Sequence, residues 1–316
     1  MNVSVIIPIY KGESTITKTL DSLLVQSVSF SELIIINDGS PDNSAEIITD
    51  YLRTKKVKRY RLITHKVPIG LAATYNQGIT LANSELVVTL HQDVILFKDS
   101  LETLIQPFKK DNAEIVASYH VVLHPIDVWK KYNFWQKCFF SRLIGKNFYG
   151  LDGKFDCFNK KALIQVGLFD GKHFRTAGED GDMVYKLRAI GRVVSTEAKI
   201  IHLHSKDPNF GIKQLYYKQA QYSEAQGSLF RRHKHNIKEY LSAFFREILL
   251  LSLLVPYLRF LGALLILIYL FLYTNKVYYY EFRNPRIYLL PFVNLSLLLV
   301  SLFFSVRGYM SGKEKV

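Results

Sequence analysis

Cysteines are scarce in this chain, and their scarcity excludes two kinds of site. The 316 residues include two of them, Cys138 and Cys157, which are too few and too irregularly spaced for a disulfide framework or a zinc site. A reduced compartment is therefore the simple interpretation. A secretory signal peptide is also missing, because no basic stretch precedes the first apolar run and Pro8 interrupts that run. We expect the part before about residue 240 to stay in the cytoplasm.

Acidic residues are outnumbered by basic ones. The 27 Asp and Glu residues face 41 Lys and Arg residues, which gives a formal net charge of +14. A basic surface suits anionic partners such as phosphates, anionic lipids or nucleic acids. The sequence contains no nucleic-acid recognition motif, and an apolar C-terminal region next to a membrane explains the charge better. We therefore expect no nucleic-acid partner.

The first 90 residues alternate between short β-branched runs and amphipathic runs. This alternation predicts an α/β fold, with a mostly parallel sheet flanked by helices. Polar turns follow two of the strands, at 37–42 and 91–93. Since ligands of such sheets bind at the carboxyl ends of the strands, we expect a nucleotide there. The predicted strands cover 3–7, 33–36, 60–64 and 86–90, and the predicted helices cover 13–26, 44–52 and 71–82.

The stretch 179–193 combines acidic residues with an amphipathic run. Glu179 and Asp180 follow a glycine-containing loop, and Asp182 comes two residues later. Carboxylates are favoured at the positive end of a helix, which can hold one rigidly beside a hydroxyl group whose proton it accepts. An ordinary acidic helix cap is the alternative interpretation of the same residues.

Four segments in a fixed order carry a resemblance to a known family. The second segment, Asn37–Ser40, is similar to an Asp-Asp-Gly-Ser turn. The third, Gly70–Ile79, is similar to a Gly-Leu-Ala-x-Ala-x-Asn-x-Gly segment, and the fourth, Glu179–Asp182, is similar to a Glu-Asp motif. Together they resemble the family 2 glycosyltransferases, which have the GT-A fold, over roughly residues 2–205. The resemblance implies transfer of a sugar from a nucleotide-diphosphate donor with inversion. The segments are Val3–Tyr10 with Glu13, Asn37–Ser40, Gly70–Ile79 and Glu179–Asp182.

The resemblance also implies roles for single residues. Asp180 is expected to be the catalytic base for the acceptor hydroxyl, and Glu179 to orient the acceptor or the loop. Asp38 is expected to accept a hydrogen bond from the nucleotide base, with an Asx turn as the alternative. Pro8 and Tyr10 are expected to shape the floor of the site and stack on that base, with an ordinary strand-end proline and core tyrosine as the alternative. The other residues expected to bind the nucleotide-sugar are Glu13, Gly70, Asn76, His91 and Asp93.

The metal motif of the family, Asp-x-Asp, is altered here, with His91 at its first position and Asp93 at its second. Asp93 can still bind a hard divalent cation, so we expect Mg²⁺ or Mn²⁺, whose charge stabilises the departing diphosphate. Three roles remain open for His91: it binds the metal through nitrogen, it contacts the diphosphate, or it does neither. His202 is preferred over His204 as a further metal ligand, although both lie on one face of an extended segment. A histidine with a backbone partner is the alternative for each.

The C-terminal residues 241–316 are mostly apolar and are expected to anchor a catalytic domain formed by residues 1–240. Residues 287–306 carry no charge and are long enough to span a bilayer. A second span is expected over about 256–275, where Arg259 lies near one end and can reach the interface. This hairpin predicts a multi-pass membrane protein, and a buried core hairpin is the alternative.

Basic residues flank the apolar region on both sides, and an interfacial helix is expected over 240–254. The positive-inside tendency places both ends of the hairpin, and with them the catalytic domain, on the cytoplasmic face. A separate segment at 129–140 mixes Trp, Phe and Lys, which suits a membrane interface or a lipid-linked acceptor. A helix packed on the catalytic core is the alternative for that segment.

These features predict a membrane-anchored glycosyltransferase of cell-surface glycan assembly. Its partners are expected to be a nucleotide-sugar donor and a lipid-linked or other membrane-associated glycan acceptor. A polyprenyl-phosphate sugar transferase, whose acceptor is the phosphate itself, is a second enzyme interpretation. A catalytically inactive scaffold with the same fold is a third, because the Asp-x-Asp motif is altered.

Overall fold

The chain forms two compact units in the computed structural model, and each is described by itself. The domain boundary predicted near residue 240 stays a prediction. Unit 1 contains Met1–His124, Lys146–Lys172 and Glu179–Ser205, and unit 2 contains Pro125–Gly145, His173–Gly178 and Lys206–Val316. The structure describes residues 1–109, 114–175, 177–203 and 210–316.

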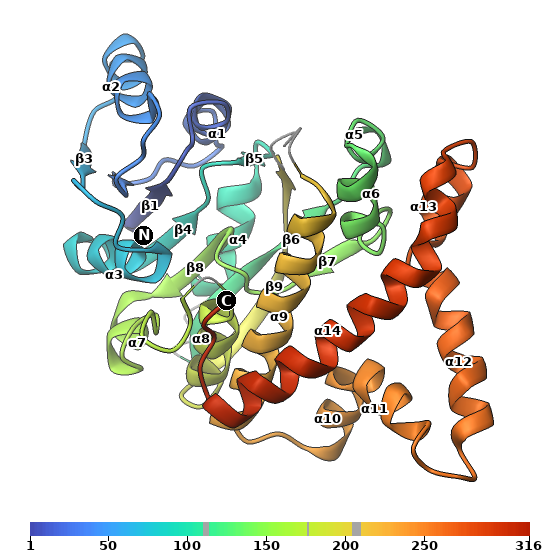
Figure 1. The fold of residues 1–316 in the computed structure, drawn as a ribbon. Helices are drawn as coiled ribbons and strands as arrows, with labels where there is room; N and C mark the ends of the chain where they lie inside the picture. Colours follow the sequence, from blue (N-terminus) through green and yellow to red (C-terminus); the bar gives the residue numbers. More distant parts are fainter. Residues whose placement is uncertain (110–113, 176, 204–209) are drawn as a thin grey trace. The chain divides into compact units, whose positions relative to one another are not determined.

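A single large sheet forms the framework of unit 1 (Figure 1). Within the described residues it has nine strands in the order β3-β2-β1-β4-β8-β6-β9-β5, with β7 paired to β6. The strands are β1 (Val3–Ile9), β2 (Glu32–Asn37), β3 (Tyr60–Thr64), β4 (Leu86–Leu90), β5 (Val94–Leu96), β6 (Ile115–Leu123), β7 (Asn147–Tyr149), β8 (Phe155–Asn159) and β9 (Arg192–His202).

The first half of the sheet is parallel. β1 pairs in parallel with β2 and with β4, and β2 pairs in parallel with β3. Val and Ile dominate β1 and β2, which are buried along their whole length, as is typical of strands covered on both faces. The carboxyl ends of these four strands therefore share one edge. The α/β class predicted from the alternating pattern is confirmed.

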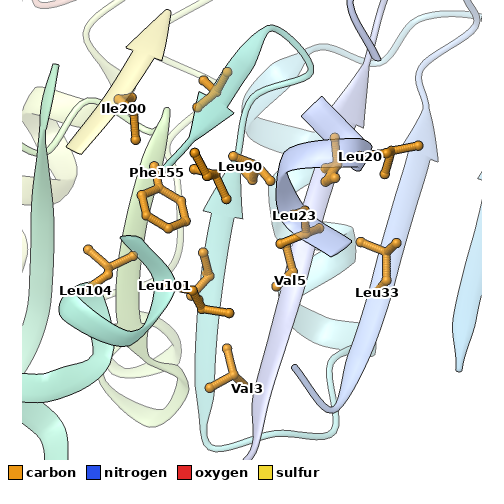
Figure 2. Packing of buried hydrophobic residues seen from close by; sticks show 14 of the residues in the cluster. Val3, Val5, Leu20, Leu23, Leu33, Leu90, Leu101, Leu104, Phe155 and Ile200 are labelled. Carbon is orange, nitrogen blue, oxygen red and sulfur yellow. The ribbon is translucent and has the colours of Figure 1, made fainter. Parts of the chain in front are cut away.

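Helices cover both faces of the sheet, because neighbouring side chains of a strand point to opposite faces. Val5 and Ile7 of β1 pack on the face that carries α1, α2 and α4, whereas Ile6 packs on the face that carries α3, α7 and α8. Figure 2 shows the first face, where leucines of α1 and α4 lie over the strands. The helices are α1 (Ile16–Leu24), α2 (Ser44–Thr54), α3 (Leu71–Leu81), α4 (Ser100–Lys109), α7 (Lys160–Gln165) and α8 (Glu179–Arg188).

The second half of the sheet is mixed. β8 is antiparallel to β4 and β6, β9 is parallel to β6, and β5 is antiparallel to β9. Leu90 at the end of β4 pairs with Phe155 at the start of β8, and Val94 pairs with His202. This register places the loop before β8 and the end of β9 beside the turn that follows β4.

Unit 2 is helical in its described part. Its long helices α9 and α14 run side by side (Figure 1). Gly227 and Gly308 lie at their contact, where a Cβ on either would collide with the main chain of the other helix. The helices are α5 (Ile126–Trp129), α6 (Phe134–Phe140), α9 (Ile212–Arg232), α10 (Ile237–Ala243), α11 (Phe245–Ser252), α12 (Arg259–Leu272), α13 (Asn275–Tyr280), the 3₁₀ helix η1 (Pro285–Leu289) and α14 (Leu290–Ser311).

One helical stretch among the described residues, Pro285–Ser311, is long and apolar enough to cross a membrane. It contains the span predicted over 287–306. The other predicted span, 256–275, contains only the 14-residue helix α12, whereas a bilayer core needs about 20 helical residues. Pro256 stands just ahead of α12, and proline lacks the N–H that a helix interior requires. The multi-pass prediction is therefore not supported, and one candidate span replaces the predicted hairpin.

The aromatic and basic segment 129–140 forms part of α5 and α6. Trp129 is fully buried and Phe134 nearly so, and both belong to an apolar cluster of unit 2 that includes Val277 and Leu290. These aromatic rings stabilise unit 2 by burial. Their partners Val277 and Leu290 belong to the C-terminal region and not to the predicted catalytic domain, so neither alternative describes the segment as predicted, and its contact with lipid stays a prediction.

Candidate active site

The turn after β1 is hydrogen-bonded to the turn after β4. The Tyr10 N–H donates to Gln92 Oε1 at 2.9 Å, and Gln92 Nε2 donates to the Tyr10 carbonyl at 2.8 Å. The Tyr10 side chain is 45% exposed, so its ring is accessible to a planar base. Pro8, in contrast, is buried inside β1. The two turns therefore form one continuous stretch of the carboxyl edge.

The turn after β1 is also joined to the turn after β2. Glu13 contributes two of these hydrogen bonds. Its N–H donates to the Asp42 carboxylate, and its own carboxylate accepts from the Asn43 N–H. The Glu13 carboxylate thus holds the turns together, and its contact with a donor stays a prediction. The bonds are Lys11 N–H to Ser40 Oγ (3.1 Å), Gly12 N–H to Ser44 Oγ (2.9 Å), Glu13 N–H to Asp42 Oδ2 (3.2 Å) and Asn43 N–H to Glu13 Oε2 (3.2 Å).

Asp38 directs its carboxylate to the loop before α3. It accepts from the Ile69 N–H at 2.8 Å and the Gly70 N–H at 2.9 Å, and His65 Nδ1 lies 2.8 Å away. Burial by itself raises the pKa of Asp38, but these hydrogen bonds outweigh it and lower the pKa below its ordinary value. Gly70 has φ +95°, a conformation that favours glycine. Asp38 and Gly70 therefore shape this loop, and direct binding of the nucleotide by either stays a prediction.

Asn76 has a similar bracing role. Its Nδ2 donates to the Phe169 carbonyl and its Oδ1 accepts from the Phe169 N–H, both at 2.9 Å. This reciprocal pair ties α3 to the loop that follows α7. Both the nitrogen and the oxygen of the Asn76 amide are thus bonded to Phe169. Contact of Asn76 with a nucleotide-sugar donor stays a prediction.

Three candidate metal ligands converge in the turn after β4 and at the last residue of β9, and we call His91, Asp93 and His202 the open triad. One ligand atom from each lies within 4.8 Å of the others. His202 Nε2 is 3.0 Å from Asp93 Oδ2, since Asp93 directly precedes the residue that pairs with His202. All three side chains are partly exposed. His204, the alternative to His202, lies outside the described residues.

His91 fits the role of a nitrogen ligand. Its Nε2 is buried and, within the part of the chain that the structure describes, has no hydrogen-bond partner. The ring stacks on Tyr75 and meets His202 edge-on, with centroids 6.3 and 6.4 Å apart. Burial lowers the pKa of His91 to about 4, so the imidazole is neutral at physiological pH and can donate its lone pair. Two nitrogens and one carboxylate form a plausible partial coordination shell for a divalent cation.

Asp180 and Glu179 lie in the first turn of α8, as the sequence predicts. Burial, and to a lesser degree repulsion from Asp152, raises the pKa of Asp180 to about 6, although the Gly181 N–H donates to its Oδ1 at 2.7 Å and opposes the shift. A carboxylate with a pKa near 6 is a stronger base than an ordinary one and is still ionised at pH 7.

Several acidic residues of unit 1 act on the pKa of Tyr75. Its phenol is fully buried, which raises its pKa, and four carboxylates raise the pKa further. Two of the four, Asp93 and Glu179, were predicted site residues more than 80 positions apart. The charges of Asp152 and Lys154 likewise act on both His91 and Asp180. The open triad and the acidic start of α8 therefore share one electrostatic environment. The four carboxylates are those of Asp156, Glu179, Asp152 and Asp93.

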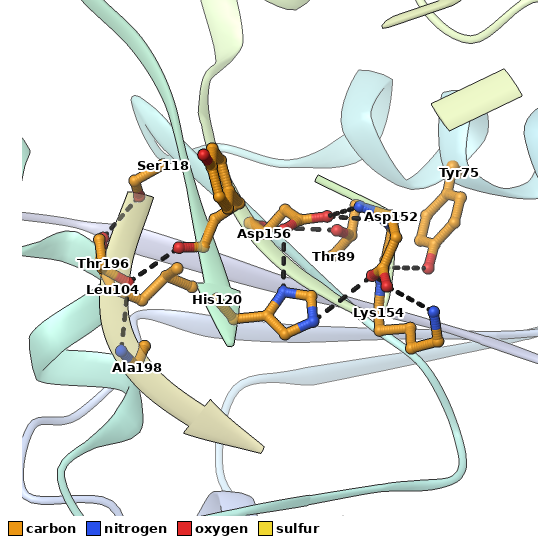
Figure 3. Close-up of polar contacts among 12 residues, drawn as sticks. Tyr75, Thr89, Leu104, Ser118, His120, Asp152, Lys154, Asp156, Thr196 and Ala198 are labelled. Carbon is orange, nitrogen blue, oxygen red and sulfur yellow. Dashed lines mark hydrogen bonds and ion pairs between the residues drawn. The ribbon is translucent and has the colours of Figure 1, made fainter. Parts of the chain in front are cut away.

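A second histidine–carboxylate group lies deeper, and we call His120, Asp152 and Asp156 the buried triad (Figure 3). His120 Nδ1 is 3.0 Å from Asp156 Oδ1 and its Nε2 is 3.4 Å from Asp152 Oδ1. Asp156 Oδ2 accepts from the N–H groups of Asp152 and Gly153. Burial lowers the pKa of His120, but the hydrogen bond and charge of Asp156 outweigh it and raise the pKa. His120 Nε2 makes no hydrogen bond among the described residues, but Lys154 Nζ lies 2.5 Å from Asp152 Oδ2 and already supplies a positive charge to that carboxylate. This group therefore fits a metal less well than the open triad does.

Comparison with known proteins gives the family of the chain. The description Glycosyl transferase family 2 matches residues 4–167, which are 164 of the 316 residues. The chain belongs to this family. It is a glycosyltransferase with a GT-A-like sheet, as the four segments predict.

Several named proteins are similar to this glycosyltransferase over part of their length. Poly-beta-1,6-N-acetyl-D-glucosamine synthase of Staphylococcus epidermidis is 37% identical over 109 residues, or 34% of this chain and 26% of that protein. The uncharacterized glycosyltransferase EpsJ of Bacillus subtilis is 35% identical over 115 residues, or 36% of this chain and 33% of that protein. The alignments thus span a quarter to a third of the length of these relatives.

Two solved structures share the fold of this glycosyltransferase. The mannosyltransferase PcManGT from Pyrobaculum calidifontis, in complex with GDP-Man and Mn²⁺, has a TM-score of 0.64 at 14% identity and covers 98% of this chain and 87% of its own. GalNAc-T7 with UDP, GalNAc and Mn²⁺ has a TM-score of 0.53 at 15% identity and covers 77% of this chain and 54% of its own. At these identities the likeness concerns the fold.

Several residues of the glycosyltransferase site were missed by the sequence-based interpretation. His120 lies in β6, where the sequence predicts a strand over 114–122, but Asp152, Lys154 and Asp156 come from a later region whose pattern is less regular. The run Asp152-Gly153-Lys154 before a β-strand was a turn signal of the same kind as the two that were noticed. Its position at the site depends on the antiparallel register of β8, which the local pattern does not contain.

Proposed function

We propose that this glycosyltransferase moves a sugar, with inversion, from a nucleotide-diphosphate donor to a lipid-linked or other membrane-associated glycan acceptor. The observation that carries the proposal is that the open triad and Asp180 lie in one electrostatic environment, because the charges of Asp152 and Lys154 act on both. We propose that one half of this site holds a cation and a diphosphate and that the other half holds a base. This division matches the two tasks of sugar transfer.

Asp180 is proposed to act as the catalytic base. Its ionised carboxylate accepts the proton of the acceptor hydroxyl as that oxygen attacks the anomeric carbon and the bond to the nucleoside diphosphate breaks. One displacement with one base inverts the anomeric configuration. Glu179, the neighbour of Asp180 at the start of α8, is proposed to orient the acceptor or the loop.

The open triad is proposed to hold the divalent cation. When bound, Mg²⁺ or Mn²⁺ supplies positive charge for the departing diphosphate. The nitrogen ligands His91 and His202 favour Mn²⁺ over Mg²⁺, which prefers oxygen ligands and retains several waters. The presence of Mn²⁺ with GDP-Man or UDP in structures of the same fold supports this choice.

A membrane-associated acceptor is supported by two observations. The stretch Pro285–Ser311 is apolar and long enough to enter a bilayer. The relative from Staphylococcus epidermidis is named as the synthase of a polysaccharide, which supports a role in glycan assembly. We propose association of unit 2 with the cytoplasmic leaflet. Transfer to polyprenyl phosphate itself is the second candidate, because it needs the same membrane surface and the same donor site.

A transfer assay on the full-length protein in lipid vesicles tests this function. A panel of uridine, guanosine and deoxythymidine diphosphate sugars is supplied with Mn²⁺, first with polyprenyl phosphate and then with lipid-linked glycans. We expect transfer or slow hydrolysis of one donor, and a loss of about 10²- to 10⁴-fold in Asp180→Asn. Asp50→Asn, the same change at an exposed position of α2, serves as the control and keeps full activity. Wild-type protein that turns over no donor would support the inactive scaffold instead.

A further inference from the structure

The loop before β8 lies against the open triad by virtue of strand register. Leu90 of β4 pairs with Phe155 of β8, so the residue after Leu90 faces the residue before Phe155. Accordingly the His91 N–H donates to the Lys154 carbonyl at 2.9 Å. The position of Lys154 therefore follows from the sheet itself and does not depend on a mobile connection.

Hydrogen bonds from buried side chains fix the backbone of the same loop. The Asp156 carboxylate, which is fully buried, accepts from the Gly153 N–H at 2.7 Å and the Asp152 N–H at 3.1 Å. The Tyr75 hydroxyl donates to the Gly153 carbonyl at 2.9 Å. Gly153 has φ +77°, and a Cβ there would lie 3.6 Å from His91 Nε2. The loop thus has a fixed backbone that touches the ring of a candidate metal ligand.

The Lys154 side chain places a positive charge at this position. Its ammonium lies 2.5 Å from Asp152 Oδ2, and its side chain is 22% exposed. Asp152 is held in turn by His120, whose Nε2 is 3.4 Å from the other carboxylate oxygen. The Lys154 charge acts on the open triad through His91 and on the base through Asp180, and in both cases it lowers the pKa. The charge of the ammonium therefore acts on both halves of the site.

We propose that Lys154 is a donor-phosphate-binding residue, positioned by the buried triad. The proposal rests on the function proposed above and assigns the diphosphate of that donor to this ammonium. The carboxylate of the open triad offsets part of the charge of a divalent cation, so the bound cation alone leaves part of the negative charge of the donor diphosphate unbalanced. An ammonium has three N–H donors, which allows it to bind a phosphate oxygen while it keeps its contact with Asp152. Lysine is a common point-charge ligand of phosphates.

Binding of nucleoside diphosphates to Lys154→Met tests the proposal. Affinities of the full-length protein for uridine and guanosine diphosphates and for uridine and guanosine are measured by calorimetry with Mn²⁺ present. We expect the diphosphate that binds wild type to bind the variant on the order of 10- to 100-fold more weakly, the range for a hydrogen bond to a charged group. Affinity for the nucleoside should not change, and Lys154→Arg should retain most of the diphosphate affinity. Lys161→Met removes an exposed lysine of α7 and should behave as wild type.

The decisive quantity is the ratio of diphosphate to nucleoside affinity within one variant, because a general loss of folded protein lowers both alike. A ratio in Lys154→Met equal to that of wild type would overturn the role of Lys154 and leave the proposed function standing. Wild-type protein that binds no nucleoside diphosphate would overturn both. If Lys154→Met does not fold, Lys154→Gln keeps a polar end without the charge and carries the same expectation.

Discussion

The open triad and the buried triad contain the same kinds of side chain but differ in what surrounds them. In the open triad, His91 keeps a buried nitrogen without a partner among the described residues, and all three side chains are partly exposed. In the buried triad, His120 and Asp156 are fully buried and bonded to each other, and Asp152 pairs with a lysine. The comparison teaches that composition alone does not distinguish a binding site from a structural network. Exposure to solvent and the presence of a lysine counter-charge do.

The largest difference between the triads is expected in catalysis. Asp93→Asn removes the one carboxylate of the open triad and should lower the transfer rate by about 10³-fold or more, since a bound cation contributes several kcal/mol to stabilising the transition state. Rates at saturating Mn²⁺ and titration of Mn²⁺ binding measure this loss. Nearly wild-type transfer by a folded Asp93→Asn protein would contradict the assignment of the triad.

The buried triad should respond in stability. Asp156→Asn leaves His120 without its partner and weakens the support of the Asp152 and Gly153 N–H groups. We expect a loss of about 3–5 kcal/mol, the cost of breaking a buried ion pair. The free energy of unfolding of unit 1, obtained from urea titrations of the detergent-solubilised protein, measures this loss. Asp93→Asn is the matched control, because its partly exposed side chain should cost about 1 kcal/mol or less. Equal losses in the two variants would remove the distinction between the triads.

The pH dependence of transfer sharpens the comparison. Burial raises the pKa of Asp180 to about 6, and a base acts only when it is deprotonated. The value of kcat/KM should therefore be level above pH 7 and should fall about tenfold per pH unit well below pH 6. In Lys154→Met the inflection should move to higher pH, because the Lys154 charge lowers this pKa. A profile that is flat down to pH 5 would argue against Asp180 as the base.

The smallest expected effect concerns the choice of metal. His91→Asp restores two carboxylates to the motif and should shift the preference from Mn²⁺ toward Mg²⁺ by about tenfold, the size of effect that a change near a metal centre typically has on affinity. Competition between the two ions, followed by the electron paramagnetic resonance signal of free Mn²⁺, measures the ratio. An unchanged ratio would indicate that His91 is not a ligand.

The parallel half of the fold could be predicted because its signals are local. Each strand is a short apolar run, and polar turns mark the carboxyl ends, so the placement of the turns 37–42 and 91–93 along one edge follows from the alternation alone. The role of Tyr10 was expected through the family resemblance. Asp180 was also found from a local signal, the acidic residues at a helix start. Its nearness to Asp93 was expected only through the family resemblance.

The rest could not be predicted because it depends on long-range pairing. β5 has three residues and β9 eleven, and neither sequence indicates that Val94 pairs with His202. The buried triad likewise joins two strands whose partnership is not visible in either one. The helix α12 is shorter than the span predicted over 256–275, because it begins only at Arg259, after Pro256, and ends at Leu272.

A crystal grown with Mn²⁺ and a nucleoside diphosphate tests the central claim most directly. Anomalous scattering from manganese locates the ion independently of any assumed function. We predict one anomalous peak within coordination distance of His91, Asp93 and His202, with the diphosphate beside Lys154 and no peak at the buried triad. A peak at His120 and Asp156, or diphosphate bound away from the open triad, would contradict the account.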